Sequence, residues 1–196
     1  MKWKEQIRKL TPYKPGKSID EVKKQFGLEK ITKLASNENP YGCSKKVIPL
    51  LNQPPAELSL YPDGYVTDLR SALADHLKVG PDQLIFGNGS DEIILMISRA
   101  ILSPGKNTIM AKSTFPQYKH NGIVEGAEIR EIPLNQGEHD LDKMLAAIDQ
   151  NTAVIWICNP NNPTGHYIPE HKLKSFLEKV PADVLVVLDE AYYEYV

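Results

Sequence analysis

The chain has 196 residues, of which 41% are hydrophobic and 24% charged, and its formal net charge is −2. This length allows one domain and a little more, and the near-neutral charge argues against a general nucleic-acid binder, which carries a basic surface. A membrane protein is also not expected because no run of about 18 apolar residues occurs. The charged N-terminal segment lacks the apolar stretch of a signal peptide. Two cysteines are too few for a disulfide scaffold, so we expect a reduced, cytoplasmic protein.

The first forty residues are expected to form an arm that is too short to hold a core of its own. Within it, Ser18 and Glu21 have the spacing of a capping box, which predicts a helix that ends at Gly27. We therefore expect an N-terminal arm over residues 1–40 and one larger domain over residues 41–196.

Short apolar runs alternate with helical patterns along the remaining chain. The expected strands are 84–86, 108–111, 128–132, 153–158 and 184–188, and the expected helices are 44–51, 66–77, 91–102, 117–125, 141–148 and 168–179. This alternation predicts a mostly parallel sheet with right-handed crossovers. The runs VIWIC and VLVVL carry no polar alternation, which is typical of central strands covered on both faces. The predicted class is therefore α/β, with three layers.

A glycine-rich turn follows the first expected strand. Ligands of open α/β sheets bind beyond the carboxyl ends of the strands, and residues 87–90 read Gly-Asn-Gly-Ser before a helix, where backbone N–H groups can hold a phosphate. An ordinary capped turn is the alternative. A Rossmann dehydrogenase is disfavoured, because Glu92 stands where the dinucleotide fingerprint needs its third glycine. The Gly-Lys-Ser/Thr of a P-loop is absent as well.

Three further residues near strand ends complete a candidate ligand site. Two Asn-Pro bonds within 159–165 favour cis peptides and a stiff turn that aims Asn162, although an ordinary Asn-Pro loop remains open. Asp189 directly follows the apolar run VLVVL, and a carboxylate at the end of a buried strand needs a partner. We interpret Asp189 either as a counter-ion for a cationic ligand atom or as a helix cap. Phe115 adds an aromatic face. A flat, phosphorylated, protonated heteroaromatic such as pyridoxal phosphate (PLP) would use all four features.

At these residues the sequence resembles the fold-type I PLP-dependent aminotransferases, and within them the histidinol-phosphate branch. The matching segments, in the family's order, are LTPYKPG (10–16), LASNENPYG (34–42), LYPDG (60–64), GNGSDE (87–92), STFPQY (113–118), NPNNPTG (159–165) and DEAYYEY (189–195). The resemblance spans essentially the whole chain. It implies the three-layer αβα large domain of that fold, with strands in the order 3-2-4-5 among the last four expected here.

The resemblance implies a role for each residue around the cofactor ring. Asp189 is expected to pair with the pyridinium nitrogen and to keep it protonated, which makes the ring an electron sink. Asn162 and Tyr192 are expected to hydrogen-bond the phenolic oxygen, and Phe115 to stack on the ring. Asp189 and Tyr192 are the expected catalytic residues of this chain.

The resemblance also assigns the phosphate and substrate contacts. Ser90 and Asp91 are expected in the phosphate loop, and Tyr61 is expected to reach the cofactor phosphate of the other subunit of a homodimer. Tyr13 and Asn37 are expected near the substrate, with Tyr13 acting across the dimer interface.

The chain departs from the family in one respect. The family's Schiff-base lysine lies downstream of the DEAY segment, and no lysine follows Asp189 in the 196 residues. We therefore expect about half of an aminotransferase, in which the C-terminal strands and the small domain are absent and the isolated chain is inactive. We also expect it to be poorly stable alone.

The expected reaction is amino transfer in histidine biosynthesis. The substrates would be histidinol phosphate with 2-oxoglutarate, and imidazole-acetol phosphate with glutamate. An aromatic-amino-acid aminotransferase, a threonine-phosphate decarboxylase, and a non-catalytic remnant or half of a split enzyme remain as alternatives. The five histidines lack the spacing of a zinc site, so no metal is expected, nor any membrane or nucleic-acid partner.

Overall fold

The computed structural model describes residues 2–11, 16–53 and 59–196. The chain divides into two compact units, of which the first comprises Met1–Tyr13 with Phe86–Val196 and the second Lys14–Ile85. The boundary expected after residue 40 stays a prediction. The first unit contains the sheet and is the one that bears on function.

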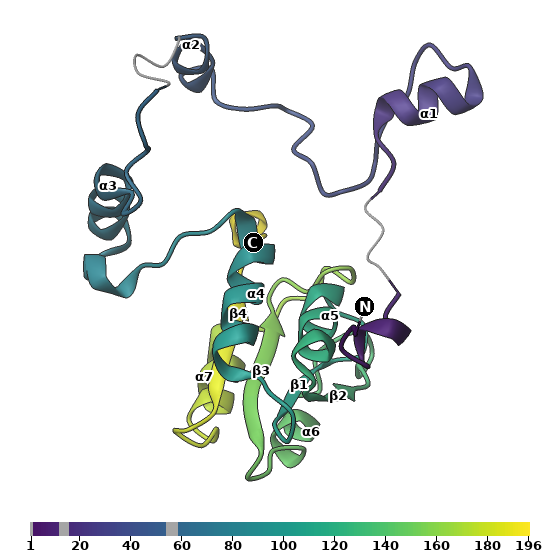
Figure 1. Cartoon of the computed structure of the whole chain (residues 1–196), viewed down its shortest axis with the longest axis vertical. Helices are drawn as coiled ribbons and strands as arrows, with labels where there is room; N and C mark the ends of the chain where they lie inside the picture. Colours follow the sequence, from purple (N-terminus) through teal and green to yellow (C-terminus); the bar gives the residue numbers. More distant parts are fainter. Residues whose placement is uncertain (1, 12–15, 54–58) are drawn as a thin grey trace. The chain divides into compact units, whose positions relative to one another are not determined.

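The sheet of the first unit has four parallel strands (Figure 1). They are β1 (Asn107–Ala111), β2 (Glu128–Ile132), β3 (Thr152–Cys158) and β4 (Leu185–Asp189). Their spatial order is β2-β1-β3-β4. The predicted parallel α/β class and the 3-2-4-5 order of the last four expected strands are therefore confirmed.

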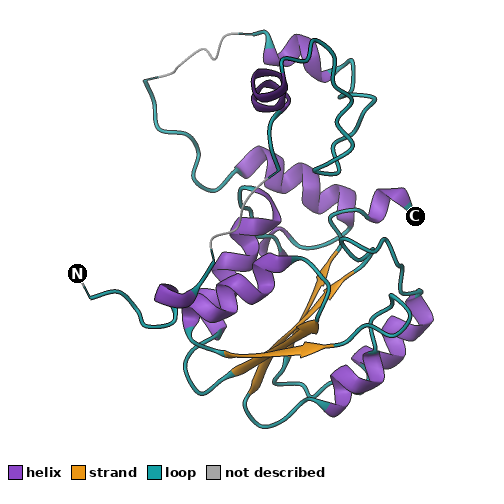
Figure 2. Cartoon of the chain, turned by 90° about the vertical axis from the view of Figure 1, so that its right-hand side faces the viewer, coloured by secondary structure: helices purple, strands orange, loops and turns teal. Residues whose placement is uncertain are grey.

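Helices cover both faces of this sheet (Figure 2). The helices α4 (Gly89–Ile101) and α5 (Pro116–Glu125) lie on one face, and α6 (Leu141–Ala146) and α7 (Glu170–Leu177) lie on the other. Side chains of β3 alternate between the two cores, with Trp156 and Cys158 on the α4/α5 side and Ile155 and Ile157 on the α6/α7 side. Each large side chain that is fully buried in this way stabilises the fold by roughly 1.5–3 kcal/mol.

The second unit is helical in its described part. It holds α1 (Ile19–Phe26), α2 (Val47–Leu51) and α3 (Thr67–Leu77). The predicted helix is present and Ser18 caps it, because the Ser18 hydroxyl accepts a hydrogen bond from the Glu21 amide. Gly27 ends α1 at a φ of 65°. Among the described helices of the chain, none is long and apolar enough to cross a membrane.

The strand expected at residues 84–86 is wrong. These residues have no regular secondary structure, and Ile85 is 66% exposed. A strand exists only where a neighbour completes its hydrogen-bond ladder, and the described sheet consists of the four strands above. Three apolar residues alone therefore do not make a strand. The expected helices are present, with shifts of a few residues at their ends.

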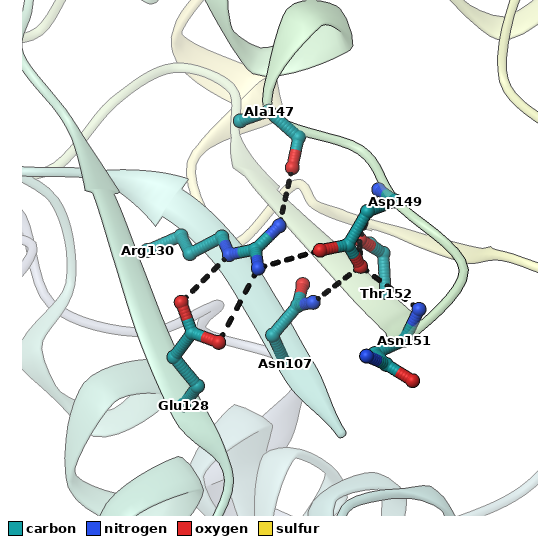
Figure 3. Close-up of polar contacts among 7 residues, drawn as sticks. All are labelled: Asn107, Glu128, Arg130, Ala147, Asp149, Asn151 and Thr152. Atoms are coloured by element: carbon teal, nitrogen blue, oxygen red, sulfur yellow. Dashed lines mark hydrogen bonds and ion pairs between the residues drawn. The ribbon is translucent and has the colours of Figure 1, made fainter. Parts of the chain in front are cut away.

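A polar network ties together the amino ends of β1, β2 and β3 (Figure 3). The Arg130 guanidinium donates to both carboxylate oxygens of Glu128, to Asp149 Oδ2 at 2.6 Å and to the carbonyl of Ala147 at 2.7 Å. Asp149 also accepts from the Asn151 amide and from Asn107. The Asn151 amide first, and then Arg130, lower the pKa of Asp149 to about 2, so the network stays charged across the neutral range.

We expect Arg130→Lys to lower the free energy of unfolding by about 1–2 kcal/mol, because an ammonium cannot replace the forked donors of a guanidinium. Urea unfolding followed by tryptophan fluorescence measures the change, since Trp156 is a buried reporter in the same sheet. Arg99→Lys, at a side chain that is 68% exposed, is the matched control and should change stability by less than about 0.5 kcal/mol. Equal effects of the two substitutions would contradict this role of Arg130.

His139 is a buried histidine whose two ring nitrogens have no hydrogen-bond partner among the described residues. Only 7% of its surface is exposed, and burial lowers its pKa to about 4. The ordinary value in an unfolded chain is about 6.5. Between these two values the unfolded chain binds a proton that the folded chain does not, so stability falls as the pH falls.

We expect His139 to remove up to about 3 kcal/mol of stability as the pH is lowered from about 6.5 to about 4. His139→Leu should abolish this loss of stability. The free energy of unfolding of the variant should therefore rise relative to that of the wild type as the pH is lowered from about 6.5 to about 4. The measurement is urea unfolding at a series of pH values. His171→Leu, at an exposed position of α7, is the control and should leave the pH dependence unchanged. A pH-independent difference for His139→Leu would show that this histidine is not excluded from protonation.

Candidate functional site

A small pocket lies at the carboxyl ends of the strands in the first unit. Its lining residues are Ser90, Phe115, Cys158, Asn162, Asp189, Ala191 and Tyr192. Five of the seven residues predicted to bind a cofactor are among them. Parallel strands bring them together, because Cys158 closes β3 and Asp189 closes β4 at paired positions of the sheet. Phe115 and Asn162 then follow β1 and β3 at the same edge.

Asp189 is held by two hydrogen bonds from different elements. Its Oδ1 accepts from the backbone amide of Ala191 at 3.1 Å, and its Oδ2 accepts from the hydroxyl of Tyr118 at 2.6 Å. The carboxylate is half-buried at the end of an apolar strand, where an unpaired charge is costly. The two donors fix its orientation toward the pocket and offset part of that cost.

Tyr118 comes from α5 and is completely buried. Its ring stacks on Trp156 with centroids 4.9 Å apart and meets the edge of Phe115 at 5.7 Å. Burial, and then the neighbouring Cys158 and Asp189, raise the pKa of Tyr118 far above its ordinary value. The hydroxyl therefore keeps its proton and remains a donor. The same ring fixes the position of Phe115 in the wall of the pocket.

The loop at residues 159–165 is hydrogen-bonded to the loop that follows β1. Both Asn-Pro bonds in it are cis, as the sequence predicts. The buried Asn161 donates to the carbonyl of Ser113 at 3.0 Å and accepts from the Thr114 hydroxyl at 2.8 Å. These bonds connect the loop after β3 to the loop after β1. These bonds hold together the two loops that carry Asn162 and Phe115.

Helix α4 begins beside the pocket. Gly89, at a φ of 72°, starts the helix, and Ser90 reaches the pocket wall. The amide of Asn88 donates to Glu92 Oε2 at 2.6 Å, which anchors the turn. A helix start directs backbone N–H groups and the positive end of the helix dipole outward, so this end of the pocket suits an anion. Asp91 lies in the first turn of α4, is exposed, and is not among the residues that line the pocket.

Three further residues were predicted to contact the cofactor or the substrate. Tyr61 and Asn37 belong to the second unit, where the Tyr61 side chain is fully exposed. Tyr13 lies outside the described residues. The roles expected for these three residues stay predictions.

The sequence reasoning missed three contributors to the site. Cys158 ends the apolar run VIWIC, which predicts only a buried strand, yet it lines the pocket, and burial raises the pKa of its thiol. Ala191 contributes through its backbone amide, which no residue-type pattern can reveal. Tyr118 lies in the first turn of α5, which begins directly after Phe115, and it reaches the site only through its contacts with Phe115 and Asp189.

Comparison with known proteins agrees with this geometry. Residues 29–196 match the family model described as aminotransferase class I and II. The chain is 62% identical to the histidinol-phosphate aminotransferase of Geobacillus sp. (strain WCH70) and 59% identical to that of Bacillus subtilis (strain 168). Both alignments cover 100% of this chain, but only 53% and 55% of those proteins. The chain thus spans about half the length of the curated relatives that it matches.

The fold is shared with solved structures. The crystal structure of histidinol-phosphate aminotransferase from Sinorhizobium meliloti in complex with pyridoxal-5'-phosphate superposes with a TM-score of 0.87 at 26% identity, covering 98% of this chain and 51% of that one. The family model covers most of the residues, and the relatives align along the entire chain. The chain therefore belongs to the class I and II aminotransferases.

Proposed function

We propose that the pocket at the carboxyl ends of β3 and β4 is a binding site for the ring and phosphate of PLP. The observation that carries this proposal is the gathering of a carboxylate, an aromatic ring, an amide and a helix start around one small pocket. The donor set fits the cofactor, because PLP combines a basic ring nitrogen, a flat face, a phenolic oxygen and a phosphate. The solved relative from Sinorhizobium meliloti contains that cofactor.

Five of the lining residues have a task in this proposal. Asp189 holds the proton of the ring nitrogen, and Phe115 packs on the face of the ring. Asn162 and Tyr192 hydrogen-bond the phenolic oxygen. Ser90, together with the backbone amides at the start of α4, binds the phosphate. Bound PLP supplies an electron sink for a carbanion next to the substrate amino group.

The surroundings of Asp189 suit it for this task. The carboxylate lies at the end of an apolar strand, so its attraction to a protonated ring is screened less than it would be in water. Its orientation is fixed by the Ala191 amide and the Tyr118 hydroxyl before any ligand arrives. A preformed acceptor of this kind lowers the entropic cost of binding.

We further propose that the protein carrying this chain transfers the amino group of L-histidinol phosphate to 2-oxoglutarate, as a homodimer in the cytoplasm. The names of the relatives at about 60% identity support the substrate, and the two free cysteines agree with a reducing compartment. Tyr61 would then contact the cofactor phosphate of the partner, and Tyr13 and Asn37 the substrate. The alternatives are the aromatic substrates and phosphothreonine expected of related branches.

The cofactor site is tested by titrating the purified chain with pyridoxamine 5'-phosphate, which needs no lysine for binding. We expect saturable binding of one ligand per chain, measured by calorimetry. Asp189→Asn should weaken it about tenfold or more, because the charge pair with the ring is lost. Glu190→Gln, an adjacent exposed carboxylate outside the pocket, is the matched control and should bind as the wild type does. Unchanged binding by Asp189→Asn, or binding that does not saturate, would overturn the proposal.

The substrate is tested on the full-length protein that carries this chain, by comparing three amino donors with 2-oxoglutarate as acceptor. We expect the largest kcat/KM for L-histidinol phosphate, and lower values for L-phenylalanine and for L-threonine O-3-phosphate. Formation of glutamate measures the rate. A higher value for either competing donor contradicts the proposed substrate. Pyridoxamine phosphate binding without turnover of any donor contradicts catalysis and supports a non-catalytic half-site.

A further inference from the structure

The tyrosine behind Asp189 touches the ligand-binding carboxylate without lining the pocket itself. The Tyr118 hydroxyl donates to Asp189 Oδ2 at 2.6 Å, a short hydrogen bond to a charged acceptor. The pocket wall contains Asp189 and Phe115 but not Tyr118. Tyr118 can therefore influence a bound ligand only through its neighbours.

The hydroxyl is held in place by two aromatic neighbours of its ring. The Tyr118 ring lies nearly parallel to Trp156, with an angle of 9° between the planes, and nearly perpendicular to Phe115. Trp156 is fixed in turn, because its Nε1 donates to the Thr108 hydroxyl at 2.8 Å. That hydroxyl donates to the Val154 carbonyl at 2.9 Å. A side chain supported in this way has little freedom to leave its acceptor.

We propose that Tyr118 is a positioning residue that acts through Asp189 and limits how tightly this carboxylate holds the proton of a bound pyridine ring. The proposal rests on the proposed PLP site and goes beyond it, because it assigns a task to a residue that does not touch the ligand. Without the Tyr118 hydroxyl, the Asp189 carboxylate would keep its orientation but would be a stronger acceptor for the ring proton.

The direction of the effect follows from the two states of the ring. When the ring nitrogen is protonated, it shares the charge of Asp189 with Tyr118. When the ring nitrogen is neutral, the full negative charge is available to the hydroxyl, so that hydrogen bond is stronger. The hydroxyl therefore stabilises the deprotonated ring more than the protonated one. Removing it should make the ring hold its proton to a higher pH.

The tyrosine hydroxyl can be removed without removing every donor that orients the Asp189 carboxylate. The Ala191 amide still holds Oδ1 when the tyrosine hydroxyl is removed, so the carboxylate keeps one fixed donor. Cys158 is the other titratable group that acts on Tyr118, and burial raises the pKa of its thiol, so it stays neutral. Tyr192 lines the same pocket and faces it from beyond β4. Among the described groups around Tyr118, Asp189 is then the charge that the hydroxyl controls.

The test uses pyridoxamine 5'-phosphate labelled with ¹⁵N in its ring, bound to the full chain. The ¹⁵N signal distinguishes a protonated from a neutral ring nitrogen and is followed across alkaline pH. For Tyr118→Phe, which keeps the ring and removes only the hydroxyl, we expect the midpoint to rise by about one pH unit, a tenfold tighter hold on the proton. Tyr167→Phe, at an exposed tyrosine outside the pocket, is the matched control and should titrate like the wild type.

The outcomes separate this inference from the proposed function. If the wild-type chain does not bind pyridoxamine phosphate, the proposed site fails and the inference fails with it. If the wild-type chain binds and Tyr118→Phe has an unchanged midpoint, the inference alone is overturned. A lower midpoint overturns it as well, because the hydroxyl would then act by orienting Asp189. A purely structural tyrosine would alter unfolding but not the midpoint.

A second measurement applies if Tyr118→Phe does not fold. Wild-type chain labelled with ¹³C at the ζ carbon of tyrosine is then titrated with the same ligand bound. The signal of the buried tyrosine should move with the midpoint of the ring nitrogen, because its hydrogen bond strengthens as the ring loses its proton. A signal that stays constant through that midpoint overturns the proposal.

Discussion

A carboxylate at the end of an apolar strand is the constraint on which the rest of the site depends. Asp189 closes β4, and its charge is tolerated there because the Ala191 amide and the Tyr118 hydroxyl both donate to it. These two donors come from opposite directions, one from the chain just beyond the strand and one from α5. Tyr118 in turn requires Trp156 and Phe115 around its ring. The acidic group is therefore connected, through Tyr118, to the aromatic part of the α4/α5 core.

The parallel direction of the strands places other polar residues beside Asp189. Because β1, β3 and β4 run in the same direction, the loops that follow β1 and β3 meet at the edge where Asp189 lies. Asn161 then joins these two loops through Ser113 and Thr114. Its side chain is buried and uses its amide to connect segments almost fifty residues apart in sequence. Asn162, the next residue, is left to face the pocket.

Much of this arrangement could be predicted from the sequence, because the informative residues carry strong local signals. The apolar runs of β3 and β4 predict buried parallel strands, and the polar residues directly after them predict the site at the carboxyl edge. Residues 84–86 have the same apolar character but form no strand, because pairing depends on a neighbour that local composition does not reveal. The Tyr118 contact was not predictable for a related reason. It joins residues 71 positions apart, and only the folded sheet brings them together.

The amino and carboxyl ends of the strands differ in how their charged groups are paired. At the amino ends of the strands, the charges of Arg130, Glu128 and Asp149 are satisfied by one another and by backbone groups, so that network stabilises the sheet (Figure 3). At the carboxyl ends of the strands, the Asp189 carboxylate accepts from two neutral donors and borders a pocket. A carboxylate neutralised by an arginine would hold a ligand proton weakly, whereas one held by a hydroxyl and an amide keeps its charge for the ligand. The neutral donors around Asp189 thus leave its charge available to the cationic ring that we propose for this pocket.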